Sequence, residues 1–420
     1  MTPTAISTAA SPVVIVGAGL AGWTTAREFR KLDTTTPLVL VTADGGDFYA
    51  KPSLSNAFAQ RRSPAQLVTT AAQVMADKLG LTLMTRTRVQ AIDVAGRTLQ
   101  TDRGPLAWGR LVLATGALPI RVPVAGDAAE TVQSVNSLDD FAAFHPLLVD
   151  VDGTVRPARH VVIMGAGLIG CEFANDLAAS GVRVTVVDPA PRPLAALLPL
   201  QASAQLQQAL ADLGVQWQLG TTVASVDRRD RDDHLAHEAA TDAAAAPAAP
   251  LSVQLANGQT LSADAVLSAI GLRADTTLAR AAGMVCERGI VVDATLSTSA
   301  AGVYALGDNA QYADGAWSAS APAGGRSLPY VMPIMQAART LAAHLAGQDV
   351  RLQFPLMPVA IKTPALPLVA APPAPAMAGG WQAAGDGIWH WLDDAGALRG
   401  FTLAGAATGQ KAKLALSVQI

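Results

Sequence analysis

Two glycine patterns give the strongest chemical signal in the sequence. Residues 13–22 read VVIVGAGLAG and residues 161–170 read VVIMGAGLIG, so eight of the ten positions are identical at a separation of 148 residues. Each contains G-x-G-x-x-G, in which the first glycine permits a tight turn, the second lets backbone approach a pyrophosphate, and the third lets a helix pack closely on a strand. The amides and dipole at the helix start would then bind the phosphates. The six glycines are Gly17, Gly19, Gly22, Gly165, Gly167 and Gly170.

The stretches around both patterns predict the elements that such a site needs. In the first copy, an apolar strand at residues 13–16 precedes the glycines, and a helix at 23–32 and a strand at 38–41 follow them. The second copy repeats this order with a strand at 161–164, a helix at 171–179 that Gly181 ends, and a strand at 182–187. Both are βαβ units of about 30 residues. If both glycine patterns were only structural turns, the order of strand, glycines, helix and strand would have arisen twice by chance. We therefore predict two dinucleotide sites.

The residue after each second strand distinguishes the two sites. Asp188 lies 18 residues beyond Gly170, close to the spacing of about 20 expected for the acid that binds the ribose hydroxyls. A carboxylate there would repel a 2′-phosphate, which favours NADH over NADPH, although Asp188 also suits an ordinary turn before Pro189. The first copy has Thr42 at this place, which does not discriminate, so we expect FAD there. The residues expected to hold this FAD are Gly17, Ala18, Gly19, Leu20, Ala21, Gly22, Thr42 and Ala43.

Composition excludes several classes of function. The chain has 420 residues and a formal net charge of −3, which offers no electrostatic case for nucleic acid. No apolar run reaches the roughly 18 residues of a membrane span, and the N-terminus lacks the features of a secretion signal. The two cysteines and six histidines show no metal-ligand spacing. We expect a cytoplasmic protein of about three domains, without membrane insertion and without a metal site.

Three further motifs accompany the glycine patterns in a fixed order. They are LVLATGA at residues 111–117, SAIGLR at 268–273 and VYALGD at 303–308. Together the five motifs resemble those of the glutathione-reductase-like flavoprotein reductases with two dinucleotide-binding folds. The resemblance implies an α/β fold of two Rossmann-like domains, with an NAD domain inserted into an FAD domain, and a small C-terminal α+β domain. It implies FAD and NAD as cofactors, with Asp308 at the ribityl chain and Gly271 closing the NAD domain.

Three other stretches narrow the resemblance. FYAKPSLSN at 48–56, MPIM at 332–335 and MPVAIKTP at 357–364 are similar to the rubredoxin–NAD⁺ reductases and the related flavorubredoxin reductases. This implies that Lys51 and Lys362 lie near the isoalloxazine and Glu172 near the flavin–nicotinamide stack. Val89, taken to end a strand at 87–89, would offer backbone to the adenine, and Val331 to the pyrimidine end of the flavin. Alternatively, the lysines extend to solvent and Glu172 is a helix-N-terminal acid.

The cysteines depart from the disulfide reductases of this architecture. The first FAD segment has no C-x-x-x-x-C, and residues 52–56 lack the single cysteine of the related peroxidases. Without a thiol relay, electrons that arrive as hydride must leave through the flavin, which can release them singly. We therefore predict an NADH-dependent reductase of a small iron carrier, most simply rubredoxin. The alternatives are a ferredoxin or flavorubredoxin reductase and a redox-dependent NADH-sensing binding protein.

The motifs also predict the domain boundaries. The FAD domain covers residues 12–120 and 272–325, the NAD domain 121–271, and the C-terminal domain 326–420. The charged and then Ala/Pro-rich stretch at 228–250 predicts a mobile loop in the NAD domain. Because rubredoxins are acidic as a class, docking would use basic residues, for which the candidates are Arg61, Arg62, Lys411 and Lys413.

Overall fold

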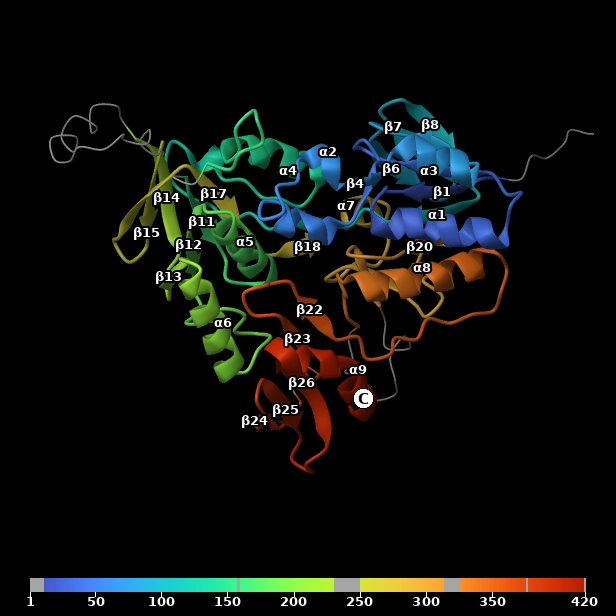
Figure 1. The fold of residues 1–420 in the computed structure, drawn as a ribbon. Helices are drawn as coiled ribbons and strands as arrows, with labels where there is room; N and C mark the ends of the chain where they lie inside the picture. The colour runs from blue at the N-terminus through green and yellow to red at the C-terminus, as the bar shows by residue number, and fades with distance from the viewer. Residues whose placement is uncertain (1–10, 157–158, 230–249, 313–324, 375–376, 419–420) are drawn as a thin grey trace, which may run out of the picture. The chain divides into compact units, whose positions relative to one another are not determined.

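The computed structural model describes residues 11–156, 159–229, 250–312, 325–374 and 377–418. The chain divides into two compact units. Unit 1 consists of Met1–Ala50, Val68–Leu118 and Arg273–Met357, and unit 2 of Lys51–Leu67, Pro119–Leu272 and Pro358–Ile420 (Figure 1). The chain changes unit within β10 (Ala117–Pro119) and β18 (Leu272–Ala274). Of the loop predicted at 228–250, residues 230–249 lie outside the described residues.

Unit 1 is built on a five-stranded parallel sheet in the order β20-β9-β1-β2-β5. Strands β1 and β2 have the bounds that the sequence predicts, and all their residues are buried because helices cover a parallel sheet on its faces. Val13 pairs with Leu38 on one side and with Arg110 on the other. The strands are β1 (Val13–Val16), β2 (Leu38–Val41), β5 (Thr82–Met84), β9 (Arg110–Leu113) and β20 (Val303–Ala305).

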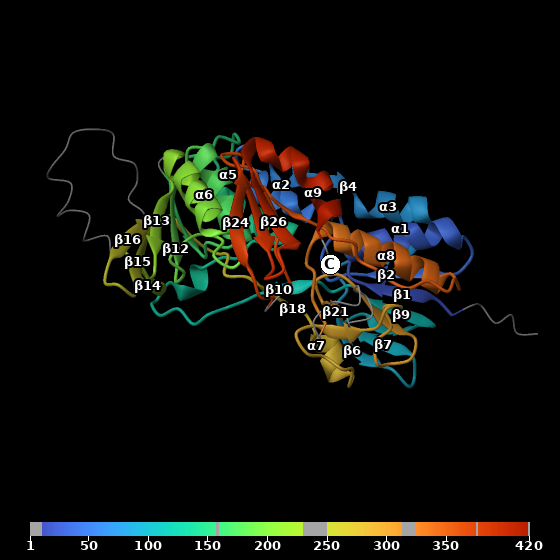
Figure 2. The same cartoon turned by 90° about the horizontal axis from the view of Figure 1, so that it is seen from below.

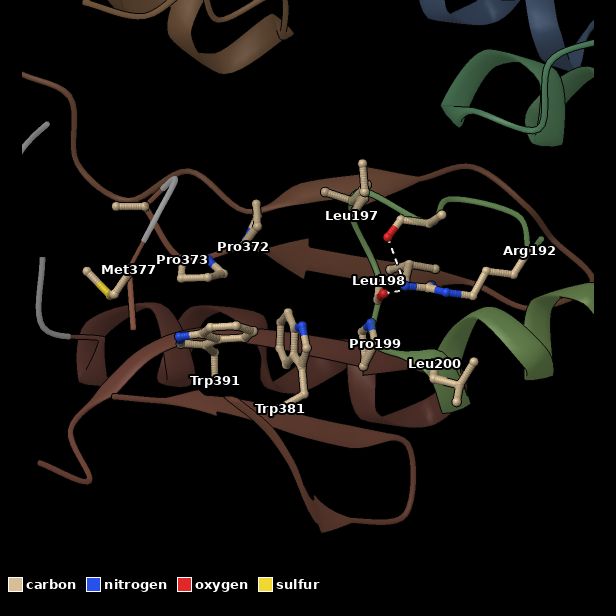
Figure 3. A pocket seen from close by; sticks show the side chains of 13 residues that line it. Arg192, Leu197, Leu198, Pro199, Leu200, Pro372, Pro373, Met377, Trp381 and Trp391 are labelled. Atoms are coloured by element: carbon tan, nitrogen blue, oxygen red, sulfur yellow. Dashed lines mark hydrogen bonds between the residues drawn. The ribbon is translucent and has the colours of Figure 1, made fainter. Parts of the chain in front are cut away.

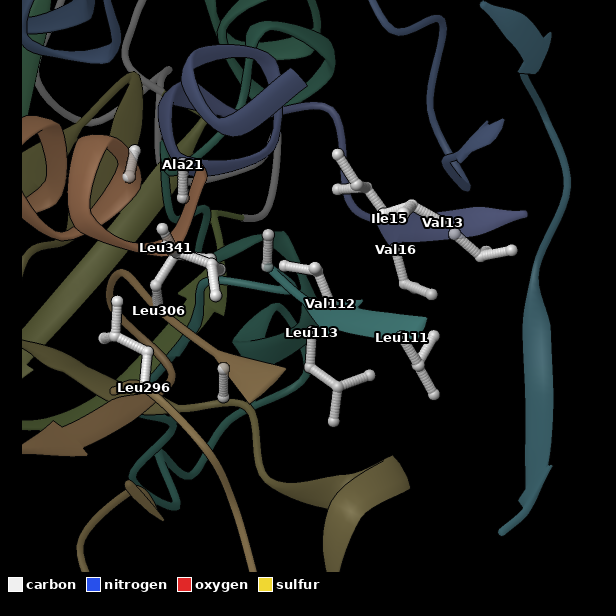
Figure 4. Packing of buried hydrophobic residues seen from close by; sticks show 14 of the residues in the cluster. Val13, Ile15, Val16, Ala21, Leu111, Val112, Leu113, Leu296, Leu306 and Leu341 are labelled. Carbon is white, nitrogen blue, oxygen red and sulfur yellow. The ribbon is translucent and has the colours of Figure 1, made fainter. Parts of the chain in front are cut away.

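Helices α1 (Leu20–Leu32) and α8 (Val331–Leu345) run alongside each other in unit 1, as both cartoon views show (Figures 1 and 2). Ala337 and Ala338 are buried on α8, and such small side chains let helices approach closely. Figure 4 shows Leu341 of α8 near Leu306, with Val112 of the sheet in the same core. Helices α1 and α8 and the parallel sheet therefore share one hydrophobic core.

Smaller elements complete unit 1. An antiparallel sheet has the order β6-β7-β8, and two-stranded pairs join β3 to β4 and β19 to β21. The bounds are β3 (Phe48–Tyr49), β4 (Val68–Thr70), α3 (Ala72–Leu79), β6 (Val89–Asp93), β7 (Thr98–Thr101), β8 (Gly104–Ala107), α7 (Thr277–Ala281), β19 (Ile290–Val292) and β21 (Ala310–Tyr312).

Unit 2 repeats the parallel arrangement around the second glycine motif. Its four-stranded sheet has the order β13-β12-β11-β17, and a three-stranded antiparallel sheet has the order β14-β15-β16. The bounds are β11 (His160–Met164), α5 (Leu168–Ala179), β12 (Arg183–Asp188), α6 (Leu200–Asp212), β13 (Gln216–Leu219), β14 (Val223–Arg228), β15 (Leu251–Leu255), β16 (Thr260–Ala263) and β17 (Ala265–Ser268). The helices begin three residues before the predicted starts in both copies, because the third glycine of each motif already lies inside the helix.

Two further parts belong to unit 2. The segment that follows β3 forms η1 (Lys51–Asn56) and α2 (Pro64–Leu67), and α4 (Leu138–Phe144) lies later in the chain. The C-terminal part is an antiparallel sheet in the order β22-β23-β26-β25-β24, followed by α9 (Lys411–Ser417) (Figure 2). Its strands are β22 (Val359–Ile361), β23 (Leu368–Ala371), β24 (Gly380–Gly385), β25 (Ile388–Leu392) and β26 (Leu398–Ala404). The predicted α/β fold with a small C-terminal α+β part is confirmed.

Candidate functional site

The first glycine motif forms a cradle in which each glycine has a separate steric reason. Gly17 has φ +111°, and a Cβ there would lie 2.2 Å from the Ala114 carbonyl oxygen. A Cβ at Gly22 would lie 1.9 Å from the Gly17 carbonyl oxygen, so only glycine lets α1 pack this close to the turn. A Cβ at Gly19 would meet nothing within 4 Å. Open space therefore faces the middle glycine, where a pyrophosphate is expected to approach.

The second motif has the same geometry. Gly165 has φ +107°, and a Cβ there would lie 2.7 Å from the Ala269 carbonyl oxygen. At Gly170 it would lie 1.9 Å from the Gly165 carbonyl oxygen, and at Gly167 it would meet nothing within 4 Å. Gly19 and Gly167 are the N-caps of α1 and α5, and neither helix start has a side-chain cap. Both sets of first-turn amides are suited to phosphate oxygens, so the residues fit two dinucleotides.

The two cradles differ at the end of the second strand. Asp188 ends β12, and its Oδ2 accepts the N–H of Ala166 at 2.6 Å, inside the glycine motif, while its Oδ1 accepts the N–H of Ala190 at 2.7 Å. Each oxygen keeps a lone pair for a ribose hydroxyl. Thr42 follows β2 and is buried, and its Oγ1 donates to Asp44 Oδ1 at 2.6 Å. Ala43 lies between these two residues. The first copy thus has no carboxylate that reaches back to its glycines.

The turn that carries Asp308 is fixed against the first cradle. Gly307 has φ +90°, and a Cβ there would lie 3.0 Å from the Cβ of Ala21 in the first turn of α1. The Gly307 N–H donates to the hydroxyl of the fully buried Tyr312 at 3.1 Å. Asp308 is therefore held near the start of α1, within the same unit as the first glycine motif.

Two residues that the sequence reasoning missed help to hold this turn. The side-chain nitrogen of buried Asn309 donates to the Leu113 carbonyl oxygen at 3.0 Å and to Thr115 Oγ1 at 3.1 Å, so it ties the 303–308 motif to the 111–117 motif. Tyr312 is the other, and burial raises the pKa of its hydroxyl, which keeps it neutral. Their proximity to Asp308 in sequence is the one signal that could have indicated them.

The remaining predicted cofactor residues lie at element ends. Val331 begins α8 and is exposed. The expectation that Val89 ends a strand is wrong: Val89 begins β6, because the preceding Thr87 N–H bonds to the Thr42 carbonyl oxygen instead of extending a ladder. Gly271 in unit 2 has φ +119°, and its carbonyl oxygen accepts the N–H of Ile120 at 3.0 Å.

Glu172 lies at the centre of a buried polar cluster in unit 2. Its side chain is 1% exposed. Oε2 accepts from Ser55 Oγ at 2.7 Å and lies 3.4 Å from Lys362 Nζ, and Oε1 accepts the backbone N–H of Lys362 at 3.0 Å. Lys362 Nζ also donates to the Pro52 carbonyl oxygen at 2.9 Å, and its side chain is 40% exposed. The structure thus brings Glu172 and Lys362 together, and η1, which Lys51 begins, contacts α5.

Asn175 and Asp176 belong to the same face of α5, and sequence reasoning missed both. The Asn175 side-chain oxygen accepts the N–H of Ala365 at 3.0 Å. The Asp176 carboxylate accepts the N–H groups of Phe58 and Ala59, each at 2.9 Å. Burial raises the pKa of Asp176 to about 6, against these hydrogen bonds, which lower it. Their spacing from Glu172, at i+3 and i+4, was the available signal.

The cysteines are in surroundings that disfavour the thiolate. Cys171 is fully buried on α5, and burial raises the pKa of its thiol. Cys286 is half-buried, and burial also raises its pKa. Neither forms a disulfide. Burial therefore disfavours a thiolate nucleophile at both positions.

The predicted docking cations all lie in unit 2. Arg61, Lys411 and Lys413 are exposed, whereas Arg62 is half-buried and donates to the Gln66 carbonyl oxygen. Arg61 and Arg62 follow η1, and the two lysines are in the first turn of α9.

One cavity is separate from these residues. It has a volume of about 480 Å³ and lies in unit 2 between residues 192–200 and the C-terminal sheet (Figure 3). Trp381 and Trp391 meet edge to face there, with ring centroids 5.5 Å apart. Arg192 is directed to the carbonyl oxygens of Ala195 and Leu198 and so closes its own loop. No predicted site residue lines this cavity.

The part of the chain that the structure describes lacks two kinds of feature. It contains no helix long and apolar enough to cross a membrane. It also contains no group of three or more His, Cys, Asp or Glu side chains that could hold a metal ion.

Comparison with known proteins shows the family of the chain. Residues 11–339 match the model of the family described as pyridine nucleotide-disulphide oxidoreductase. The chain belongs to this family. Residues 351–417 match a second model, described as rubredoxin binding C-terminal domain.

Similar proteins cover almost the whole chain. It is 41% identical over 408 residues to the rubredoxin-NAD(+) reductase of Acinetobacter baylyi, covering 95% of each chain. It is 40% identical over 408 residues to the rubredoxin-NAD(+) reductase of Alcanivorax borkumensis, covering 96% of this chain and 97% of the relative. The crystal structure of the covalent putidaredoxin reductase–putidaredoxin complex aligns with a TM-score of 0.81 at 23% identity, covering 98% of this chain and 94% of that one, and so shares the fold.

Proposed function

We infer that this chain is an NADH-dependent FAD flavoprotein reductase that passes electrons to rubredoxin or a similar small iron carrier. The observation that carries the inference is the pair of equivalent glycine cradles in one chain, only one of which has a carboxylate that reaches back to its glycines. Relatives of the same length named rubredoxin-NAD(+) reductase, and the C-terminal match to a rubredoxin-binding domain, support the acceptor.

Each cradle has its own cofactor in this proposal. In unit 1, the amides at the start of α1 would bind the pyrophosphate of FAD, with Thr42, Ala43, Val89, Asp308 and Val331 at the rest of the molecule. In unit 2, the amides at the start of α5 would bind the pyrophosphate of NADH, and Asp188 would accept hydrogen bonds from its ribose. Bound FAD would accept two electrons from NADH together and release them one at a time.

We propose that Lys51, Glu172 and Lys362 are the catalytic residues. A cation near the flavin favours negative charge on its ring system, so the lysines would promote reduction. Glu172 contributes in two ways that its contacts support: it anchors the backbone of Lys362, and it balances part of the ammonium charge at 3.4 Å. The Lys362 side chain is partly exposed, and two of its three N–H donors bond to Pro52 and Glu172, which leaves one donor for another acceptor.

Electrons must leave without a thiol. Burial raises the pKa of both Cys171 and Cys286, which disfavours the thiolate that disulfide or peroxide chemistry requires. The described residues offer no metal site that could act as an internal relay. In this proposal, an external one-electron carrier accepts the electrons from the flavin, as the match to a rubredoxin-binding domain supports.

We retain two further proposals from the sequence. The domain division is an FAD domain at residues 12–120 and 272–325, an NAD domain at 121–271 and a C-terminal domain at 326–420. Limited proteolysis that cuts at these boundaries would support it. We also propose a cytoplasmic location, which fractionation of the source cells with an antibody to the chain would test.

The test of function is NADH-driven reduction of cytochrome c with and without added rubredoxin, over a series of salt concentrations. We expect strong stimulation by rubredoxin that weakens as salt rises, because oppositely charged surfaces steer docking. Direct reduction of the flavin by NADH should change much less with salt. Stimulation by a [2Fe–2S] ferredoxin but not by rubredoxin would replace the proposed acceptor.

Charge reversal locates the docking surface. Lys411→Glu combined with Lys413→Glu should lower the rubredoxin-dependent rate several-fold and leave flavin reduction by NADH unchanged. Lys78→Glu, at an exposed lysine of α3 in unit 1, is the matched control and should have little effect. Equal effects of the two changes would remove these lysines from the docking surface.

A further inference from the structure

Helix α5 presents three polar side chains on one buried face. Glu172, Asn175 and Asp176 are spaced by three and four residues, so they lie on the same side of the helix. They are 1%, 2% and 3% exposed respectively. Burying polar groups is unfavourable unless they are paired. All three are paired, and each accepts a hydrogen bond from at least one backbone N–H group of two segments that are distant in the sequence.

The first segment is residues 362–365, which begins with Lys362. Glu172 accepts the N–H of Lys362 at 3.0 Å, and Asn175 accepts the N–H of Ala365 at 3.0 Å. The side chain of Thr363 closes the same turn by donating to the Leu366 carbonyl oxygen at 2.7 Å. The backbone that carries Lys362 is thus fixed to α5 at both ends of a four-residue turn.

The second segment is η1 and the residues after it. Ser55 donates to Glu172 at 2.7 Å, and the N–H groups of Phe58 and Ala59 donate to Asp176. The Phe58 ring lies 5.3 Å from the ring of Phe141, centroid to centroid, inside a buried aromatic cluster. The segment that Lys51 begins is therefore fixed at its far end by a carboxylate shielded from water.

We propose that Asn175 and Asp176 are positioning residues for flavin reduction by NADH. Asn175 fixes the turn that carries Lys362, and Asp176 fixes the segment that carries Lys51. This rests on the proposed function, in which the two lysines act on the flavin. Both side chains act through backbone amides of other residues, which distinguishes them from the catalytic groups.

The expected decrease in the rate of flavin reduction follows from the sensitivity of hydride transfer to geometry. Displacement of a catalytic group by about 1 Å can lower a rate by roughly 100-fold. Loss of one anchoring hydrogen bond shifts a turn by less than that, so we expect a decrease on the order of tenfold. A merely structural role would instead lower the free energy of unfolding and leave the rate of the folded enzyme unchanged.

The experiment uses FAD-loaded, full-length protein and measures the rate of flavin reduction at saturating NADH by stopped flow. Asn175→Ala and Asp176→Asn should each lower this rate about tenfold with little change in the NADH concentration at half-saturation. Asn175→Asp, which keeps an acceptor for the Ala365 amide, should restore most of the rate. Ser203→Ala is the matched control, since Ser203 is a buried residue of α6 that donates to the Pro193 carbonyl oxygen.

Double-mutant cycles identify the route by which each residue acts. The Asn175→Ala effect on the rate should disappear in a Lys362→Met background, and the Asp176→Asn effect should disappear in a Lys51→Met background. The crossed pairs should be close to additive. Effects that persist undiminished in both lysine variants would overturn the proposal.

Hydrogen exchange gives a readout independent of turnover. Amides at 362–366 should exchange faster in Asn175→Ala, and those at 57–59 faster in Asp176→Asn, relative to wild type and to Ser203→Ala. If the folded variants show unchanged exchange and unchanged rates, the positioning roles are contradicted but the proposed function is not. A wild-type protein whose flavin NADH does not reduce would contradict the proposed function itself.

Discussion

The two glycine cradles share a backbone and differ in what surrounds it. In both, the first glycine meets a backbone carbonyl from the neighbouring strand's end, the third meets the carbonyl of the first, and the second faces open space. The difference begins at the end of the second strand, where one copy has Thr42 and the other has Asp188. Under the proposed function, phosphate binding would depend on what the copies share, and the choice of dinucleotide on what they do not.

The helices that start at the two cradles differ more strongly. Two positions after the third glycine, α1 has Thr24 and α5 has Glu172; six positions after it, α1 has Glu28 and α5 has Asp176. Glu28 pairs with Lys31 at 2.7 Å near the surface, whereas Asp176 is buried against backbone amides. The helix that follows the glycines thus packs in the core of its own unit in one copy, whereas in the other it also anchors two lysine-bearing segments by hydrogen bonds.

The largest expected effect comes from filling the open space at each middle glycine. Gly19→Val should abolish FAD binding, and Gly167→Val should leave the flavin bound but abolish its reduction by NADH, since each side chain would occupy the place of a pyrophosphate. Both residues have negative φ and no neighbour within 4 Å of a Cβ, so the fold should survive. Flavin absorbance and circular dichroism measure the two outcomes.

The same two variants can contradict the assignment of FAD to the first cradle and NADH to the second. If Gly167→Val loses its flavin, or Gly19→Val keeps it, then the two dinucleotides are exchanged between the cradles or both cradles contribute to one of them. An unfolded variant would be replaced by Gly19→Ala or Gly167→Ala, where a single methyl group points into the same space and should weaken binding in the same order.

The second effect concerns coenzyme choice. Asp188→Ala should lower kcat/KM for NADH by about 10- to 100-fold, since charged hydrogen bonds contribute about 1.5–3 kcal/mol, and should narrow the preference over NADPH. Removal of the carboxylate also leaves the Ala166 amide without its 2.6 Å partner. Thr42→Val is the control in the other cradle and should leave the coenzyme preference unchanged. Equal use of both coenzymes by the wild type would refute the role of Asp188.

Local pattern was sufficient to predict the cradles. Strands β1 and β2 have the predicted bounds because four consecutive apolar residues suit a strand covered on both faces. Glycine spacing predicted both turns because a Cβ at the first or third glycine of each motif would overlap backbone atoms, and this constraint acts on single residues. The helix starts were placed three residues late because the third glycine was counted as turn when it is already helical.

Long-range contacts were beyond local pattern. Asn175 and Asp176 bond to Ala365 and to Phe58 and Ala59, partners separated from them by more than 100 residues. The sequence shows their shared helix face but not which backbone amides lie opposite. Val89 was misplaced for a related reason, because the N–H of Thr87, two residues earlier, bonds to the Thr42 carbonyl oxygen, which lies 45 residues away in the sequence. Such partners become visible only when the chain is folded.

The third effect is the pH dependence of stability, which should have opposite signs for an acidic residue on each of the two helices. The folded-state pKa of Asp176, about 6, lies above its ordinary value of 3.8. The stability that this group adds is therefore present below about pH 4 and is lost as the pH rises through 6. Burial opposes ionisation of Glu28, but its hydrogen bond and charge pairing with Lys31, and with Arg27, hold its pKa below the ordinary 4.5. Its contribution is present above that value and is lost as the pH falls.

Matched neutral variants measure this contrast. As the pH rises from 4 to 7, the wild type should lose up to about 3 kcal/mol in its free energy of unfolding relative to Asp176→Asn. Over the same rise in pH, the free energy of unfolding of the wild type should increase relative to that of Glu28→Gln. The amount should be smaller, since the Glu28–Lys31 pair lies near the surface. Urea unfolding at several pH values provides the numbers. Slopes of the same sign in both variants would contradict the difference between the two helices.

The smallest expected effect is at the residue after the third glycine, which is Trp23 in one copy and Cys171 in the other. Cys171 is fully buried, its Sγ lies 3.4 Å from the Ala166 carbonyl oxygen, and burial raises the pKa of its thiol. Cys171→Ser combined with Cys286→Ser should therefore keep NADH-driven electron transfer within about twofold, with about 1–2 kcal/mol lost in the free energy of unfolding for the buried hydroxyl. The native thiol of Cys171 should also resist alkylation until the protein unfolds. If the double variant stays folded and holds its flavin but loses electron transfer, then thiol chemistry takes part in the reaction, and Cys171 is a functional difference between the cradles and not only a packing one.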